Sequence, residues 1–107
     1  MQHITAPELA QWLADEKRPQ PFLLDVRQPW EYQLCHLADA QLVPLHTLPD
    51  AAGELDPQRA VVCICHHGIR SRQAAAFLEQ QGFADVTNLS GGIDAWSDQV
   101  DPAVPKY

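Results

Sequence analysis

A strand, a short loop and a helix follow one another in the second half of the chain, and no other feature constrains the fold as strongly. The apolar run 60–64 (AVVCI) is typical of a buried strand. Residues 71–81 have a helical pattern, and Gly82 is a suitable residue to follow the end of that helix. The loop 65–70 (CHHGIR) lies between them, so Cys65 stands at the carboxyl end of the strand, just before the helix.

The position of Cys65 gives its thiol a reason to ionise. The start of a helix carries unpaired N–H groups and a partial positive charge, and both stabilise an anion. The thiolate is the form of cysteine that acts as a nucleophile. Free cysteines are commonly core residues, but a place before a glycine-containing turn and a helix favours a nucleophile over a structural thiol.

Short apolar runs and helical patterns also alternate along the rest of the chain. The capping box 5–8 (TAPE) predicts a helix that runs to about residue 16. The other expected elements are strands at 22–26, 40–43 and 86–89, a short helix at 29–34, a loop with one short helix at 46–59, and a helix at 93–100 with Trp96 facing inward. Strands alternating with helices over short connections predict an α/β fold with a parallel sheet.

The length of 107 residues fits one domain, 1–107, with an extended tail from about residue 101. In open parallel sheets, ligands bind outside the carboxyl ends of the strands. Cys65 and Asp25 both follow or end such strands, so we expect the functional site at this edge.

The composition limits the partners and the compartment. A net charge of −7 argues against nucleic acid or an anionic membrane surface as the main partner. No apolar run is long enough to span a membrane, and the start lacks the pattern of a secretory signal. Three cysteines are an odd, low number for a disulfide scaffold and fit a reducing compartment, so a cytoplasmic location is expected.

The local charge after Cys65 is opposite to that of the whole chain. No acidic residue occurs between Cys65 and Ala76, whereas this stretch contains His66, His67, Arg70 and Arg72. This cluster of basic residues coincides with the start of a helix. It therefore favours a small anionic substrate over a chance cluster on a solvated surface.

Three stretches of the sequence resemble the rhodanese family of sulfurtransferases. The first comprises 24–27 (LDVR), Glu31-Tyr32 and 36–40 (HLADA); the second is 61–71; the third comprises Gly82-Phe83, Val86, 89–93 (LSGGI) and Ala95-Trp96. They occur in the order and spacing of the family, and residues 100–105 are similar to the tails of small bacterial single-domain members. The chain departs from the family at Cys35, where a glycine often precedes the histidine.

This resemblance implies a three-layer fold, in which an open parallel sheet of about five strands is flanked by helices. It implies that Cys65 is the catalytic nucleophile, that N–H groups of its loop point at the sulfur, and that Arg70 contacts an anionic donor. The implied reaction moves a sulfane sulfur from thiosulfate or another persulfide donor, through a persulfide on Cys65, to cyanide or a thiol acceptor. This reaction requires no metal or organic cofactor.

Two loop residues have a clear chemical reason to bind the substrate. Arg70 puts a cation at a helix start, where it opposes the helix dipole, and this favours a charge kept for a ligand over an ordinary surface arginine. Its guanidinium can grip two oxygens of one oxyanion. Gly68 fits a position that needs a positive φ or a close approach of the backbone to the ligand, although an ordinary turn would also use it.

The remaining loop residues are assigned to substrate binding by their place beside Cys65. His66 and His67 are each either solvated or in contact with the donor, and Ile69 completes the loop. Ser71 is expected mainly to bond a backbone N–H at the helix start, with a contact to the sulfur as a secondary role.

Asp25, Arg27 and Glu31 are expected to form a structural ion-pair cluster at the rim of the site. A transferred sulfur needs no carboxylic acid or base, so catalysis by these groups is the less favoured interpretation.

A zinc site is not expected. The run of Cys63, Cys65, His66 and His67 lacks the two separated ligand pairs of structural zinc sites. Adjacent histidines should point apart, and Cys63 should face the core.

Three other functions deserve comparison with sulfur transfer to a small molecule. Phosphatases and arsenate reductases of the same fold carry one more residue between cysteine and arginine, whereas four residues (66–69) separate Cys65 from Arg70 here. Non-catalytic binding modules usually lack the cysteine, which this chain keeps. A relay that passes the sulfur to a protein acceptor fits the same residues.

Overall fold

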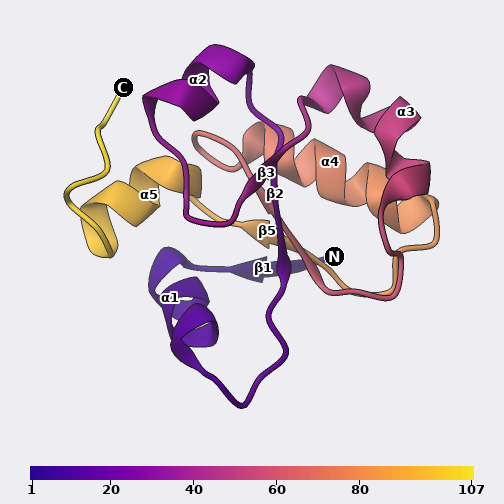
Figure 1. The fold of residues 1–107 in the computed structure, drawn as a ribbon, viewed down its shortest axis with the longest axis horizontal. Coiled ribbons are helices and arrows are strands. Elements are labelled where there is room, and N and C mark those ends of the chain that lie inside the picture. Colours follow the sequence, from indigo (N-terminus) through magenta and orange to yellow (C-terminus); the bar gives the residue numbers. More distant parts are fainter.

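The structure, a computed structural model, describes residues 1–107. Strands and helices alternate along the chain, as Figure 1 shows: β1 (Gln2–Ile4), α1 (Ala6–Ala14), β2 (Phe22–Asp25), α2 (Pro29–Leu34), β3 (Gln41–Leu42), η1 (Leu45–Thr47), α3 (Leu48–Ala51), η2 (Ala52–Glu54), β4 (Val61–Ile64), α4 (Ile69–Gln80), β5 (Val86–Leu89) and α5 (Gly92–Gln99). The elements η1 and η2 are single 3₁₀ turns. This order confirms the α/β fold that the sequence predicts.

The strands form one parallel five-stranded sheet in the order β1-β5-β4-β2-β3. β4 lies at the centre, between β5 and β2. Because all strands run the same way, their carboxyl ends meet at one edge, where Cys65 follows β4 and Asp25 ends β2. The fold thus places Cys65 in the middle of the edge at which open parallel sheets bind ligands.

Helices cover both faces of the sheet and give the fold its three layers (Figure 1). Successive side chains of a strand point to opposite faces. In β4, Val61 and Cys63 face a core shared with α3 and α4, whereas Val62 and Ile64 face a core shared with α1 and α5. A strand with a core on each face has no polar side, which explains why 61–64 is an unbroken apolar run.

The helix α1 begins at the predicted capping box. Thr5 Oγ1 accepts a hydrogen bond from the Glu8 N–H (3.3 Å), and Glu8 Oε1 accepts one from the Thr5 N–H (2.9 Å). The helix ends at Ala14, earlier than expected, because Asp15 adopts an extended conformation. The side-chain amide of Gln20 donates to the carbonyls of Trp12 and Asp15 and so satisfies the free end of the helix.

The helix α4 packs on β4 and β5 through Ala74, Ala75 and Leu78, which are fully buried. Gly82 follows its end with a φ of +91°. The Gly82 N–H donates to the Glu79 carbonyl and the Phe83 N–H to the Leu78 carbonyl, which is the Schellman arrangement. The predicted helix end at Gly82 is therefore confirmed.

Two strands differ from the expectation. β1 is a strand that the sequence pattern does not predict, because its three residues show no apolar alternation and its first two are exposed. Its conformation comes from pairing with residues 87–89 of β5. β3 is reduced to Gln41–Leu42, since only these residues reach the ladder of β2.

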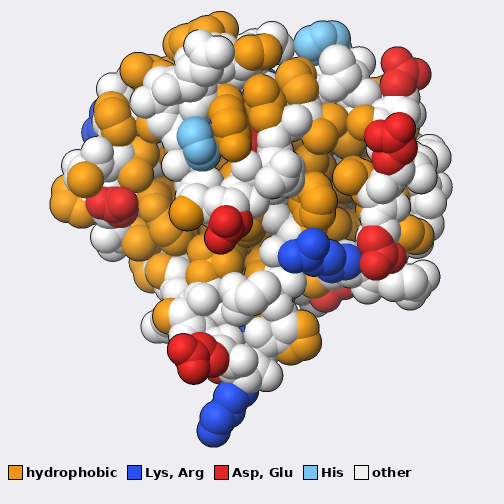
Figure 2. All heavy atoms as spheres, in the orientation of Figure 1, with side chains coloured by type: hydrophobic (Ala, Val, Ile, Leu, Met, Phe, Trp, Pro, Cys, Tyr) orange, Lys and Arg blue, Asp and Glu red, His pale blue; other side chains and the backbone are white.

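The surface reflects the acidic composition. Figure 2 shows acidic side chains spread over one face, with few basic groups between them, in keeping with the net charge of −7. None of the helices has the length and apolar character needed to cross a membrane.

Replacement of Gly82 by alanine tests the end of α4. Because a Cβ at Gly82 would meet no atom within 4 Å, Gly82→Ala changes little besides the strain of a left-handed φ. We expect a loss of about 1 kcal/mol in the free energy of unfolding, measured by urea denaturation. Gly53→Ala is the matched control, since Gly53 has equal space without a positive φ and should be neutral or slightly stabilising. Equal losses in both variants would contradict the assignment.

Candidate active site

The loop between β4 and α4 curls around the Cys65 sulfur. The Gly68 N–H donates a hydrogen bond to Cys65 Sγ at 3.0 Å, and Cys65 is 1% exposed. Gly68 has a φ of +100°, and a Cβ there would lie 3.2 Å from the Gly91 nitrogen and 3.3 Å from the Leu89 carbonyl oxygen. Glycine is thus required both for the turn and for the close passage of β5.

The start of α5 fixes the first two peptide groups of the loop. The Ile93 N–H donates to the Cys65 carbonyl (2.9 Å) and the Asp94 N–H to the His66 carbonyl (3.1 Å). A Cβ on Gly92 would overlap both carbonyls, so only glycine allows this approach. In a trans peptide the C=O and the following N–H point in opposite directions. The carbonyls therefore face α5, and the next two N–H groups of the loop face away from it.

A buried polar network lies on the other side of the sulfur. Ser71 Oγ is 3.3 Å from Cys65 Sγ and donates to Asn88 Oδ1, while Asn88 Nδ2 donates to the Gly68 carbonyl (3.3 Å). The hydroxyl of Ser71 contacts the sulfur and Asn88 rather than a backbone N–H. Sequence reasoning missed Asn88, although a lone amide in the buried strand 86–89 (VTNL) is a usable signal.

The three cysteines occupy different environments, and all are free thiols. Cys63 faces the core, as expected, and burial, with a smaller effect of Cys65, raises its pKa to about 12. Cys63 therefore remains a thiol at physiological pH. Cys35 packs against the C-terminal segment, with Sγ 3.6 Å from the Pro105 carbonyl oxygen.

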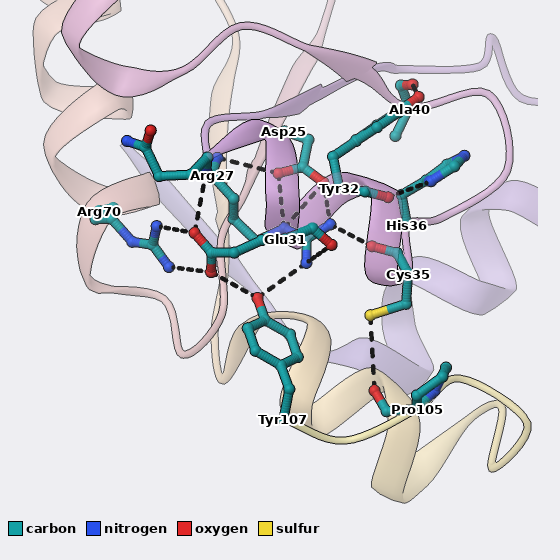
Figure 3. Close-up of polar contacts among 11 residues, drawn as sticks. Asp25, Arg27, Glu31, Tyr32, Cys35, His36, Ala40, Arg70, Pro105 and Tyr107 are labelled. Carbon is teal, nitrogen blue, oxygen red and sulfur yellow. Dashed lines mark hydrogen bonds and ion pairs between the residues drawn. The ribbon is translucent and has the colours of Figure 1, made fainter.

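The residues expected to form one rim cluster are divided between two ion pairs (Figure 3). Arg27 is fully buried, and its guanidinium donates three hydrogen bonds of 2.9, 3.1 and 2.7 Å to the Asp25 carboxylate. Arg70 grips Glu31 through two of 2.6 and 2.9 Å. The Arg70 side chain is 33% exposed, against 4% for Glu31. The sequence predicts that Arg70 binds an anionic ligand. In the structure its guanidinium instead binds the carboxylate of Glu31.

Glu31 is ionised despite its burial. The hydrogen bonds from Arg70 lower the pKa of this carboxyl to about 2, against the opposing effect of burial, with further help from the Gln28 N–H and the Tyr107 hydroxyl. The same pairing raises the pKa of Arg70. The two groups thus remain a neutral pair throughout the physiological range.

Tyr107 joins the two ion pairs, and no sequence pattern points to it. Its hydroxyl donates to Glu31 Oε2 (2.7 Å) and accepts from Arg27 Nη1 (2.9 Å), as Figure 3 shows. Burial raises the pKa of Tyr107 to about 12, so the hydroxyl keeps its proton. The segment 101–107 was expected to be extended, but a turn from Asp101 to Val104 bends it back toward the site.

His66 and His67 do not point apart, contrary to the expectation. Their rings stack with centroids 3.9 Å apart, and Tyr107 stacks on His66 at 3.8 Å. Burial and the neighbouring His67 lower the pKa of His66, so it is neutral at pH 7. His67 is exposed.

The fold brings Asp94 to the two histidines. One ligand atom from each of His66, His67 and Asp94 lies within 4.8 Å of the others. This set differs from the cysteine-containing run considered in the sequence. However, the Lys106 ammonium lies 3.3 Å from Asp94 Oδ1. Asp94 is therefore already paired with a cation, and the cluster belongs to an ion-pair group.

The side chain of Ile69 is turned outward and is 69% exposed, and Arg72 is also exposed. A cavity of about 240 Å³ is lined by His67, Gly68, Ile69 and Arg72 of the loop and α4 and by Asn88, Ser90, Gly91 and His3. Cys65, His66 and Arg70 line neither this cavity nor any other. The basic stretch after Cys65 is therefore divided between two sides of the loop.

An open parallel sheet with a buried cysteine at its central strand end, circled by a short loop that opens a helix, defines an α/β domain with a cysteine-centred site. Residues 5–99 match the family model described as "Rhodanese-like domain". The chain belongs to this rhodanese family.

Similar proteins include chains of comparable length and longer ones. A "Sulfurtransferase" of Allochromatium vinosum is 42% identical over 88% of this chain and 86% of its own. "Thiosulfate sulfurtransferase GlpE" of Pseudomonas fluorescens is 37% identical over 84% of this chain and 80% of its own. "Probable adenylyltransferase/sulfurtransferase MoeZ" of Mycobacterium tuberculosis is 37% identical over 97% of this chain, which spans about a quarter (26%) of that protein.

Among solved structures, a rhodanese-like domain protein from Staphylococcus aureus has a TM-score of 0.84 and 32% identity, over 94% of this chain and 95% of that one. The fold expected from the sequence is therefore that of solved members of the family.

The pKa of Glu31 gives a prediction for stability at low pH. A carboxyl whose pKa is lowered on folding contributes stability that is present above its ordinary value of about 4.5 and is lost as the pH falls toward 2. Over this pH window, the free energy of unfolding of wild-type protein should therefore fall by about 1 kcal/mol or more beyond that of Glu31→Gln. The reason is that one unit of pKa difference between the folded and unfolded states corresponds to about 1.4 kcal/mol. Urea denaturation at several pH values measures this difference.

Glu54→Gln, which changes an exposed glutamate, is the control and should follow the wild-type pH dependence. Identical curves for wild-type protein and Glu31→Gln would show that Glu31 is not held as an ion pair.

Proposed function

We propose that the protein is a sulfurtransferase in which Cys65 carries the transferred sulfur as a persulfide. The observation that carries this proposal is the Gly68 N–H bonded to Cys65 Sγ at 3.0 Å, at the end of the central strand. A backbone donor aimed at the sulfur stabilises negative charge there, as an oxyanion hole does for oxygen. Membership of the rhodanese family and relatives named sulfurtransferases support the same chemistry.

In the first step, the Cys65 thiolate attacks the outer sulfur of the donor, for which we propose thiosulfate. The new S–S bond forms as the S–S bond of thiosulfate breaks, and sulfite leaves with the bonding electron pair. The charge before and after the step is the same, three negative charges in all. A thiolate attacks directly, so neither His66 nor His67 is needed as a base.

In the second step, an acceptor thiolate or cyanide attacks the outer sulfur of the Cys65 persulfide. The Cys65–sulfur bond breaks, the thiolate of Cys65 is restored, and the acceptor leaves as a persulfide or as thiocyanate. The persulfide is an anion, so the loop N–H that faces Sγ favours the intermediate as well as the free enzyme. All groups in this cycle come from the chain and the two substrates.

Arg70 is the residue that we propose to contact the anionic donor. A guanidinium has five N–H donors, and the pair with Glu31 uses two of them. A third of the side chain is exposed, so the remaining N–H groups can meet an oxyanion while the ion pair persists. His66, His67, Gly68, Ile69 and Ser71 complete the proposed binding loop.

The size of the loop supports sulfur transfer over phosphatase or arsenate reductase activity. Only four residues separate Cys65 from Arg70, and the Gly68 N–H is already hydrogen-bonded to the sulfur, so the loop is small for a tetrahedral phosphate. The free thiols of all three cysteines support a reducing, cytoplasmic compartment.

Transfer of the sulfur to a protein acceptor is the second candidate function, and the exposed side chain of Ile69 on the loop itself favours it.

The persulfide can be observed directly. Incubation with thiosulfate should add one sulfur to the intact mass of the wild-type protein, and cyanide should remove it as thiocyanate. Cys65→Ser should form no adduct and no thiocyanate above background, because the nucleophile is lost. Cys35→Ser, a second change of a buried thiol, is the control and should still form the adduct. Thiocyanate production by Cys65→Ser, or phosphate-ester hydrolysis without sulfur transfer, would refute the proposal.

Steady-state kinetics with thiosulfate test Arg70. Arg70→Ala should lower kcat/KM for thiosulfate about tenfold or more, since a charge-assisted hydrogen bond contributes about 1.5–3 kcal/mol. Arg72→Ala removes a neighbouring exposed arginine of α4 and should change kcat/KM less than threefold, by weaker attraction alone. An unchanged kcat/KM in Arg70→Ala, or an equal loss in both variants, would reject the role of Arg70.

A further inference from the structure

The segment 101–107, which we call the strap, folds back from the end of α5 toward the active-site loop. Figure 1 shows it in yellow, running from α5 toward α2. The Ser97 hydroxyl donates to the Val104 carbonyl (2.7 Å), and Lys106 pairs with Asp94 and Asp98 at 3.3 and 2.6 Å. Cys35 Sγ contacts the Pro105 carbonyl.

Tyr107 connects the strap to the residues around Cys65. Its ring stacks on that of His66, the residue after Cys65, with the ring centroids 3.8 Å apart and an angle of 7° between the ring planes. The rings of Tyr107 and Trp30 form a T-shaped pair with centroids 5.8 Å apart. The Tyr107 hydroxyl lies between Arg27 and Glu31 and donates to Glu31 Oε2, the oxygen that Arg70 Nη2 also binds (Figure 3). One side chain of the strap therefore contacts both the loop and the ion pair of Arg70.

The strap leaves no hollow over the nucleophile. Cys65 is 1% exposed, and none of the five cavities, of about 180 to 430 Å³, is lined by Cys65, His66 or Arg70. The largest lies between Leu13, Phe22 and Arg59, away from the carboxyl edge of the sheet. Tyr107 packs on His66, the residue after Cys65, and so fills the surface beside the nucleophile on this side of the loop.

Apart from Tyr107, the strap is anchored mainly by the half-buried Val104, which packs on the core and accepts the Ser97 hydrogen bond. Residues 101–103, 105 and 106 are exposed, and no residue of the strap is fully buried. The ion pairs of Lys106 involve an ammonium side chain that is 50% exposed, and such pairs contribute little. A segment with few buried contacts can open without unfolding the sheet. Release of Tyr107 is thus the step that would uncover His66 and the ion pair of Glu31 and Arg70.

We propose that the strap is a gate over the Cys65 loop, which admits small sulfur acceptors while Tyr107 is seated and admits bulky thiols only when Tyr107 leaves. The acceptor part of this inference rests on the proposed sulfurtransferase function. Tyr107 is a positioning and selectivity residue here, not a catalytic one, because its hydroxyl keeps its proton and faces Glu31 and Arg27 rather than the sulfur.

Alkylation of Cys65 tests the gate without any sulfur donor. Iodoacetamide is the small probe and a fluorescein maleimide the bulky one, and mass spectrometry of the peptide that contains Cys65 separates its labelling from that of Cys35 and Cys63. In Tyr107→Ala the ratio of the bulky-probe rate to the small-probe rate at Cys65 should increase at least fivefold over wild-type protein. Tyr107→Phe, which keeps the stacked ring and loses both hydroxyl hydrogen bonds, should give an intermediate ratio.

Tyr32→Phe is the matched control. Tyr32 lies in α2, its hydroxyl donates to the Ala40 carbonyl at 2.6 Å, and its ring stacks on His36 rather than on the loop. This variant also loses a hydrogen bond of a half-buried tyrosine, but its probe ratio should equal that of wild-type protein. Equal ratios in wild-type protein and Tyr107→Ala, or an equal increase in Tyr32→Phe, would overturn the gate.

Acceptor kinetics extend the test to sulfur transfer. With thiosulfate as donor, the kcat/KM for reduced thioredoxin relative to that for cyanide should increase at least fivefold in Tyr107→Ala, and an unchanged ratio would overturn the selectivity. The two hypotheses fail separately. If wild-type protein forms no persulfide but its alkylation ratio depends on Tyr107, the proposed function is wrong and the gate stands. If persulfide forms and the alkylation ratio is insensitive to Tyr107, the gate is wrong and the function stands.

Discussion

The conformation of the loop around Cys65 depends on the hydrogen bonds from the start of α5 to the carbonyls of Cys65 and His66. These bonds satisfy two carbonyl groups at a buried turn, and they use N–H groups that a helix start leaves free. The approach is so close that only Gly92 fits. With its carbonyls fixed outward, the loop can turn back at Gly68 and donate an N–H to the sulfur. The environment of the Cys65 sulfur therefore depends on a segment almost thirty residues later in the chain.

The charges near Cys65 are arranged by internal pairing rather than by surface composition. The chain has a net charge of −7, yet two carboxylates at the carboxyl edge are each held by an arginine. Burial of Glu31 would be costly without Arg70, and together they form a neutral pair beside the loop. Tyr107 adds a hydrogen bond to each ion pair without adding charge. The same contacts that hold Glu31 in place also hold the strap over the loop.

Much of the fold could be predicted because the relevant signals are local. The apolar run 61–64, the capping box at Thr5 and the glycine at the end of α4 each specify an element through nearby atoms. β1 could not be predicted, since three residues with little apolar character become a strand only by pairing with β5. The prediction that His66 and His67 point apart was wrong, because the two rings stack, and Tyr107 stacks on His66 in turn.

The order of residues alone predicts the alternation of strands and helices, the place of Cys65 between a strand and a helix, and the turn at Gly68. These follow from periodicity, backbone conformation and helix ends, which act over a few residues. Three pairings are visible only in the folded chain: Arg70 binds Glu31, the Ser71 hydroxyl donates to Asn88, and the ring of Tyr107 stacks on His66. Such pairings join residues far apart in the chain, and they form only when the order of strands in the sheet brings those residues to one edge.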